Sequence, residues 1–197
     1  MLMLKVTDHP EISVVIPCLN EEENAEAIAR AVIANLETVT DDFEIIFIDN
    51  GSTDRTAEIV RGLCRTDARV RLIVNTRNFG QMRSPTHALF QARGRGIIGI
   101  AADFQDPPEL IPQLVKRWRD GAEIVMGVSE TKVTSSLYAS VRKFSYDLQR
   151  KFGDYPIIPN ATGFGIFDHK VIRAIADLNE PEPFVRGLIV ETGYAVE

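Results

Sequence analysis

The sequence predicts an α/β domain with a mainly parallel sheet flanked by helices, on two observations. Short apolar segments alternate along the chain with longer segments whose apolar residues recur at helical spacing. Several of the short apolar segments also end abruptly in polar residues, among them Asn20, Asp49, Asn78 and Asp103. Because the carboxyl ends of parallel strands lie along one edge of a sheet, we expect these polar residues to share a cleft there.

Length and composition limit the classes of protein to consider. The 197 residues, 45% of them hydrophobic, suffice for a single domain over 1–197, with 1–11 as a short N-terminal segment. The balance of 22 basic and 28 acidic residues, a net charge of −6, argues against nucleic-acid binding. Cys18 and Cys64 are too far apart to suggest a disulfide framework or a zinc site, and Cys18 is expected to be a buried strand residue.

No segment has the composition of a membrane anchor or a leader. The start of the chain lacks the apolar core of a signal peptide, and no run approaches the ~18 consecutive apolar residues of a membrane span. We therefore expect the chain as given to be soluble and cytoplasmic.

The predicted strands are apolar, mostly β-branched runs closed by proline, glycine or polar residues. They cover 12–17, 43–48, 70–74, 97–102, 124–128 and 162–167. The predicted helices run from Asn20 as cap to 36, from Thr53 or Asp54 as cap to 63, and over 84–93, 110–118, 138–152 and 170–178. Pro85 implies that the 84–93 helix begins or is broken there. The polar stretch 129–136 is expected to be mobile or ordered by a ligand.

The run after the fourth predicted strand concentrates oxygen ligands. Asp103, Gln105 and Asp106 follow the strand directly, and Pro107 and Pro108 then stop it. On an extended chain, Asp103 and Gln105 point the same way, as Mg²⁺ or Mn²⁺ would require. The alternative interpretation is a helix cap next to ordinary surface acids. Neither a G-x-G-x-x-G after the first strand nor a P-loop occurs in the chain.

Four motifs in order carry a family resemblance: Val15–Glu22, Ile48–Asp54, Arg77–Gly80 and Ala102–Glu109. Together they resemble the family 2 glycosyltransferases, which have the GT-A fold. Within that family the chain is similar to the branch of dolichol-phosphate mannosyltransferase and the bacterial polyprenyl-phosphate glycosyltransferases. The resemblance covers roughly 12–193.

The resemblance implies a set of residues that bind the nucleotide-sugar donor. They are Pro17, Asn20, Glu21, Asp49, Asn50, Arg77, Ala102 and Asp103. The first three would line the nucleoside pocket, and the next two would hydrogen-bond the base or the ribose. The arginine would complement the nucleotide, a role suited to its planar fork of donors.

The resemblance also implies the groups that act in the reaction. Asp103 and Gln105 would hold a divalent cation, Mg²⁺ or Mn²⁺, on the donor's diphosphate and so favour its departure. Arg142, with Lys132 as a weaker candidate, would reach the donor diphosphate or the acceptor phosphate. The alternative for Arg142 is a place on a solvated helix face.

Two positions depart from the family pattern. Ala101 stands where the family usually has the first Asp of an Asp-x-Asp motif, so the cation would lose an anionic ligand. Asn50 stands where a second Asp is common, which would alter the contacts to the base.

The resemblance implies an inverting transferase that moves a sugar from a UDP- or GDP-sugar to a polyprenyl phosphate. Such an acceptor is already anionic and needs no general base. One alternative is transfer to a saccharide hydroxyl in cell-envelope glycan synthesis, with Asp168 or Asp106 as base, although Asp168 also suits a helix cap. Another is a domain that binds the donor without turnover, for which Ala101 is the support.

The resemblance finally implies a location. Members of the branch normally continue into C-terminal membrane helices, which this sequence does not include. We expect the full-length protein at the cytoplasmic face of the membrane, attached through segments missing here, and a homo-oligomer is left open.

Overall fold

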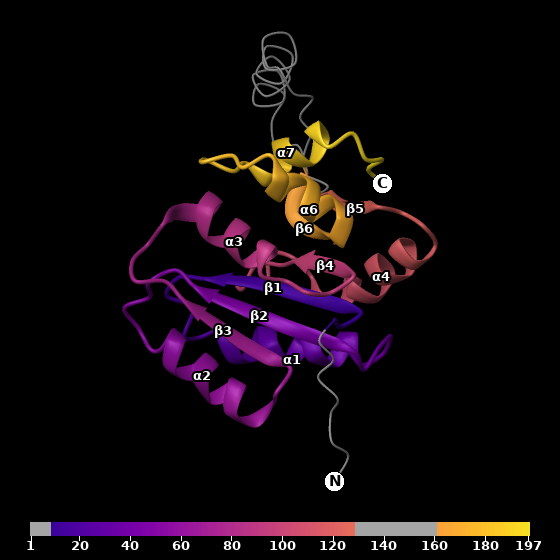
Figure 1. Cartoon of the computed structure of the whole chain (residues 1–197). Coiled ribbons are helices and arrows are strands. Elements are labelled where there is room, and N and C mark those ends of the chain that lie inside the picture. Colours follow the sequence, from indigo (N-terminus) through magenta and orange to yellow (C-terminus); the bar gives the residue numbers. More distant parts are fainter. Residues whose placement is uncertain (1–8, 129–160) are drawn as a thin grey trace, which may run out of the picture.

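The computed structural model describes residues 9–128 and 161–197, which form a six-stranded sheet flanked by helices (Figure 1). The strands lie in the order β3-β2-β1-β4-β6-β5. They are β1 (Ile12–Cys18), β2 (Phe43–Asp49), β3 (Val70–Val74), β4 (Gly96–Gly99), β5 (Ile124–Val128) and β6 (Ala161–Asp168). β1 to β4 are parallel to one another, and β6 runs antiparallel to both β4 and β5. The predicted α/β class with a mainly parallel sheet is confirmed.

The helices form a layer on each face of the sheet. They are α1 (Ala25–Leu36), α2 (Thr56–Thr66), α3 (Gly80–Phe90), the 3₁₀ turn η1 (Pro108–Leu110), α4 (Ile111–Arg119), α6 (His169–Asp177) and α7 (Val185–Glu191). Figure 1 shows α1 and α2 beneath the sheet and α3 with α6 above it. Within the described ranges, no helix has the length and apolarity needed to cross a membrane.

Two apolar clusters, one on each face of the sheet, make up the core. One face packs Val14, Ile45 and Phe47 against α1, α2 and α4. The other packs Val15 and Ile46 against α3, α6 and α7. All seven residues of β2 are buried, which explains why its sequence is nearly continuous in apolar residues.

One acid is buried at the start of β2. Glu44 is 1% exposed and accepts hydrogen bonds from the Ser13 hydroxyl at 2.8 Å, the Arg71 guanidinium at 2.6 Å, and the backbone and side chain of Arg93 at 2.9 Å. Burial alone raises the pKa of Glu44, but these hydrogen bonds, Arg93's first, outweigh burial and bring the pKa below its ordinary value. The cluster ties β1, β2, β3 and the loop after α3 together.

The structure differs from the predicted elements at several ends. The strand expected over 97–102 ends at Gly99, because the chain turns sharply after it and Phe104 has a φ of 59°. α3 begins at Gly80 instead of residue 84, and Gly80 enters it with a φ of 89° that glycine adopts readily. α7 was not predicted. The expectations for 129–136 and 138–152 lie outside the described residues.

Candidate functional site

The predicted site residues from four strands lie along one edge of the sheet. β3, β2, β1 and β4 are parallel neighbours, so the segments that follow them emerge at the same edge. Because β6 is antiparallel to β4, its beginning, near Gly163, reaches this edge as well. The edge therefore collects the segments that begin at Cys18, Asp49, Val74 and Gly99.

The loops after β1 and β2 are joined by hydrogen bonds between them. The Oδ1 of Asn20 accepts from the Thr53 N–H at 2.9 Å, and the Asn20 N–H donates to the Ser52 hydroxyl at 2.9 Å. The Glu22 carboxylate accepts from the Arg55 N–H at 3.1 Å. The prediction that Asn20 caps a helix is wrong: Asn20 has a φ of 57° and bonds to the other loop, and α1 begins only at Ala25.

Two predicted donor-binding acids lie at the base of these loops. Asp49 is 2% exposed and accepts a hydrogen bond from the Ser52 N–H at 3.2 Å. Glu21 accepts from the side chain of Asn24 at 2.8 Å and is partly exposed. Burial raises the pKa of the nearby Cys18 thiol, and the acids around it act in the same direction. Cys18 is thus a neutral core residue, as predicted.

Arg77 lies on the loop between β3 and α3 and is exposed. Its guanidinium carbon lies 4.0 Å from the centre of the Phe79 ring, a cation–π distance, and it donates to the Asn78 carbonyl at 3.1 Å. Among the described residues, the remaining guanidinium donors of Arg77 have no hydrogen-bond partner. Asn50, in contrast, is 7% exposed, and its side-chain amide bonds to this same loop.

The segment after β4 is a turn, not an extended strand. Asp103 accepts a hydrogen bond from the Gln105 N–H at 3.1 Å, and Phe104 between them has a positive φ. The expectation that Asp103 and Gln105 point the same way from an extended chain is therefore wrong in its premise. Asp103 and Gln105 are both exposed, whereas Ala102 is buried.

The donor set at this turn fits a divalent cation in part. A carboxylate and an amide oxygen are suitable ligands for Mg²⁺ or Mn²⁺. Within the described residues, however, no group of three or more His, Cys, Asp or Glu side chains could hold a metal ion. Asp103 and Gln105 would therefore need further oxygen ligands from a bound diphosphate or from water.

A cleft of about 520 Å³ opens beside this turn. Pro17, Ala101, Gln105 and Asp106 line it next to the turn, and the last two bring polar side chains there. Asp106 is 7% exposed and accepts from the Ala101 N–H at 3.2 Å. The apolar walls come from α3, the sheet face and the segment into α7, and include Val15, Met82, Leu89, Met126, Phe167, Phe184 and Ile189.

The proline inside α3 borders the cleft. Pro85 has no N–H, so it cannot close the helical hydrogen bond to the carbonyl of Gln81. Both residues line the cleft. The Thr86 hydroxyl bonds the next carbonyl, that of Met82, at 2.7 Å. Pro85 thus marks the helix face that borders the cleft, a signal that sequence reasoning noted without connecting it to a site.

Asp168 lies at the opposite edge of the sheet. It pairs in register with Gly96, at the beginning of β4, whereas the candidate site follows the end of β4. Its carboxylate accepts from the Lys170 N–H at 3.0 Å as the cap of α6, and from the Trp118 indole at 3.1 Å. The cap interpretation of Asp168 is confirmed. Arg142 and Lys132 lie outside the described residues.

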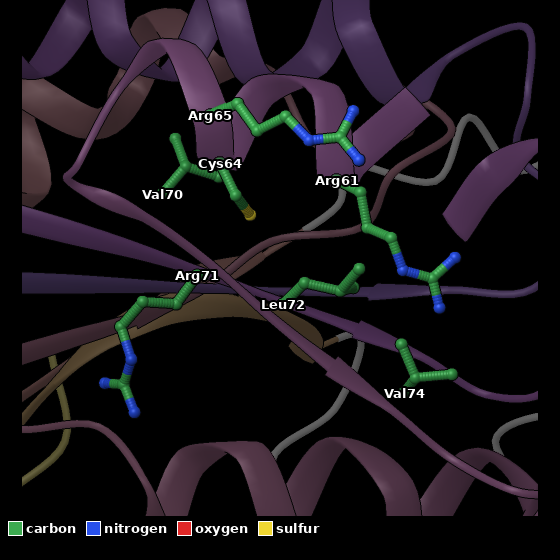
Figure 2. Close-up of a pocket in the computed structure, with 7 residues that line it drawn as sticks. All are labelled: Arg61, Cys64, Arg65, Val70, Arg71, Leu72 and Val74. Atoms are coloured by element: carbon green, nitrogen blue, oxygen red, sulfur yellow. The ribbon is translucent and has the colours of Figure 1, made fainter. Parts of the chain in front are cut away.

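A second hollow runs along β3 and is separate from the candidate site. Figure 2 shows Arg61 and Arg65 reaching from α2 on one side of the strand, with Arg71 on the other. Its lining is Arg61, Cys64, Arg65, Val70, Arg71, Leu72 and Val74. None of these residues was predicted to bind the donor or a metal.

Comparison with known proteins places the chain in a family. Residues 13–176 match the glycosyl transferase family 2. The chain is 32% identical over 184 residues to a bactoprenol glucosyl transferase of Shigella phage SfV, covering 93% of this chain and 60% of that protein. It is also 32% identical over 187 residues to the uncharacterised glycosyltransferase YkcC of Bacillus subtilis, covering 94% and 58%. The chain thus spans somewhat over half the length of these relatives.

Solved structures show the same fold. A mannosyltransferase of Pyrobaculum calidifontis, in complex with GDP-Man and Mn²⁺, superposes with a TM-score of 0.66 at 21% identity, over 96% of this chain and 55% of that one. Glucosyl-3-phosphoglycerate synthase of Mycobacterium tuberculosis, with Mn²⁺, UDP and phosphoglyceric acid, gives 0.60 at 23% identity, over 93% and 62%. With a family match over most of its length and the GT-A fold, this chain belongs to glycosyl transferase family 2.

Proposed function

We propose that the domain transfers a sugar from a nucleoside-diphosphate donor to a polyprenyl phosphate, with inversion at the anomeric carbon. The observation that carries the proposal is the cleft, which begins at the polar turn and continues between apolar walls. A polar end suits a sugar diphosphate, and an apolar wall suits the first isoprene units of a lipid acceptor. The bactoprenol glucosyl transferases at 32% identity support the same acceptor class.

The donor would lie along the edge formed by the ends of β1 to β4. The predicted contacts are Pro17, Asn20, Glu21, Asp49, Arg77, Ala102 and Asp103. The buried Asp49 and the exposed Arg77 guanidinium offer the base, the ribose or the phosphates an acceptor and a fork of donors. Structural neighbours hold either UDP or GDP-Man, so titration with both nucleotides identifies the base.

In the proposed reaction, a phosphate oxygen of the acceptor attacks the anomeric carbon from the face opposite the leaving group. The bond from that carbon to the donor's diphosphate breaks, and the nucleoside diphosphate leaves with the electron pair. A divalent cation held by Asp103 and Gln105, together with diphosphate oxygens, would neutralise the leaving group. Arg142 is proposed for the same phosphates.

A second candidate function is transfer to a saccharide hydroxyl, which requires a general base. The position of Asp168 at the opposite sheet edge removes one of the two bases considered for it. Asp106 remains, because it is an acid that lines the cleft. If this candidate is correct, Asp106→Asn abolishes turnover and leaves donor binding unchanged.

Calorimetric titration with UDP and GDP, each with and without Mn²⁺, tests donor binding first. Binding of one nucleotide that tightens with Mn²⁺ is the expected result, and binding of neither would overturn the proposal. A transfer assay with the matching donor then compares a short-chain polyprenyl phosphate with soluble saccharides. Transfer to the lipid alone supports the first function, and transfer to a saccharide supports the second.

A further inference from the structure

The side-chain amide of Asn50 makes four hydrogen bonds, all within the protein. Its nitrogen donates to the Asn78 Oδ1 at 2.9 Å and to the Gly80 carbonyl at 3.3 Å. Its oxygen accepts from the Asn75 Nδ2 at 3.1 Å and from the Phe79 N–H at 2.9 Å. An amide has two donor hydrogens and two acceptor sites, so this one is fully used. A buried side-chain amide that makes all four hydrogen bonds within the protein has no donor or acceptor left for a nucleotide-sugar.

The partners of Asn50 all belong to residues 75–80, the loop between β3 and α3 together with Gly80, the first residue of α3. That segment is also tied at its two ends, because Asn75 donates to the Ser84 hydroxyl at 2.9 Å and Asn78 accepts from the Gly80 N–H at 2.7 Å. The network thus runs from the end of β2 through the loop to the first turns of α3. Networks in which every member is satisfied hold a segment in a single conformation.

Packing against the loop agrees with the hydrogen bonds. A Cβ built on Gly51, which follows Asn50, would lie 2.8 Å from the backbone carbonyl carbon of Arg77. The chain after β2 and the loop therefore touch through backbone atoms, with no room for a side chain. Asn50 and Gly51 together fix the position of the Arg77 backbone, from which the guanidinium side chain extends.

We propose that Asn50 is a positioning residue that fixes the loop over residues 75–80 and, through it, the Arg77 guanidinium for the nucleotide donor. The inference rests on the proposed function and replaces the expected direct contact of Asn50 with the base. It also gives a reason for asparagine where a second aspartate is common in the family. A carboxylate at this position would place oxygen against the Asn78 Oδ1 and the Gly80 carbonyl and could donate to neither.

The test measures nucleotide affinity of the whole chain by calorimetry with UDP and GDP in the presence of Mn²⁺. Asn50→Asp should weaken the binding of the nucleotide that the wild type prefers by about 10-fold. Gln113→Glu, the same change of amide to carboxylate on the exposed face of α4, should leave it unchanged. Unchanged or tighter binding by Asn50→Asp would overturn the proposal, because a direct contact to the base would survive that substitution.

A double-mutant cycle with Arg77 separates positioning from contact. If Asn50 acts through Arg77, adding Asn50→Asp to Arg77→Ala should cost less than 2-fold beyond Arg77→Ala alone. Losses that multiply would overturn the proposal. The exchange rate of the Gly80 amide proton should rise in Asn50→Asp and stay unchanged in Gln113→Glu, since only the former disturbs its acceptor.

If Asn50→Asp fails to fold, Asn75→Ala gives the same test, because it removes a partner of Asn50 and leaves Asn50 itself. It should weaken nucleotide binding and also be non-additive with Arg77→Ala; full affinity would overturn the proposal. Failure of the proposed function has a different signature, since the wild type would then bind neither nucleotide.

Discussion

The two halves of the sheet form different kinds of surface at the edge where β1 to β4 end. In the half formed by β3, β2 and β1, all strands are parallel, and the loops that follow them are tied to one another by side-chain hydrogen bonds, from Asn20 to Thr53 and from Asn50 to Asn78. In the half formed by β4, β6 and β5, the antiparallel β6 and the segment into α7 line a cleft with apolar walls, which α3 and the end of β1 complete.

The difference shows where specificity and adaptability reside. Buried amides and carboxylates need partners in fixed geometry, so the first half is organised before any ligand arrives. Apolar walls make no directional demands and can accommodate ligands that vary in length or shape. A donor recognised by its polar groups fits the first half, and an isoprenoid acceptor fits the second.

The largest effect is expected from a substitution that destabilises the half formed by β3, β2 and β1. Glu44→Ala leaves Arg71 and Arg93 without their shared buried carboxylate, which should lower the free energy of unfolding by about 3–5 kcal/mol. Urea unfolding followed by circular dichroism measures the change. Glu58→Ala, at an exposed position of α2, should change it by less than about 0.5 kcal/mol. Equal stability of the two variants would show that the cluster does not hold the first half together.

The same acid makes stability depend on pH. Because the pKa of Glu44 is lowered in the folded state, its contribution is present above the pKa of the unfolded chain, near 4.5, and is lost as the pH falls through the lower folded value. Unfolding free energies of the wild type should therefore decline below about pH 4.5 more steeply than those of Glu44→Gln. Parallel curves for the two proteins would contradict this assignment.

The next largest effect is expected on turnover, from a substitution in the turn that follows β4. Asp103→Asn removes the charge proposed for the cation while the side chain stays exposed, so turnover should fall roughly 100-fold, or about 2.7 kcal/mol, with unfolding unchanged. Steady-state transfer with Mn²⁺ measures it. Asp177→Asn, an exposed acid at the end of α6, is the matched control. Full turnover by Asp103→Asn would remove this residue from the chemistry.

A smaller effect is expected on the KM for the acceptor, from a substitution in the apolar wall of the cleft. Phe184 lines the cleft and is 39% exposed, so Phe184→Ala should remove acceptor contact worth about 1–2 kcal/mol. The KM for a polyprenyl phosphate should rise about 5- to 30-fold, and the nucleotide affinity should stay unchanged. A loss of nucleotide affinity instead would mean that the cleft belongs to the donor. Leu178→Ala, exposed at the end of α6, serves as the control.

The smallest effect concerns the ion pair that joins α3 to the segment before α7. Arg83 on α3 pairs with Glu182, which precedes α7, and both side chains are largely exposed. Exposed pairs contribute little, so Arg83→Ala should change the unfolding free energy by less than about 1 kcal/mol. The salt dependence of unfolding should differ little from that of the wild type. A change above 2 kcal/mol would show that the pair holds the segment before α7 against α3.

The sequence predicted the parallel half well, because its signals are local. The buried strands over 12–17, 43–48 and 70–74 are runs of β-branched and apolar residues, and their polar ends lie at one edge of the sheet, as predicted. The family and its fold followed from the motifs at those ends. The donor contacts themselves stay predictions, with Asn50 now proposed in a different role.

What the sequence did not predict depends on contacts between distant segments. The Asn50 network joins residues 25 to 30 positions apart, and nothing near Asn50 in the chain marks them as partners. The cleft is assembled from β1, α3, β6 and the segment into α7, a helix too short to give a clear periodic signal. The turn at Asp103 is not predicted from the sequence because it needs a positive φ at Phe104, which is rare for a residue other than glycine.

The hollow along β3 bears on whether two copies of the chain can pair through their sheet edges. β3 is the last strand on its side of the sheet within the described residues, and such an edge is a template for another strand. Here Arg61 and Arg65 are exposed beside it, whereas Arg71 is paired with the buried Glu44. Two copies meeting edge to edge would bring like charges together, which opposes aggregation by sheet extension. We therefore expect this edge to be a poor surface for pairing two copies of the chain.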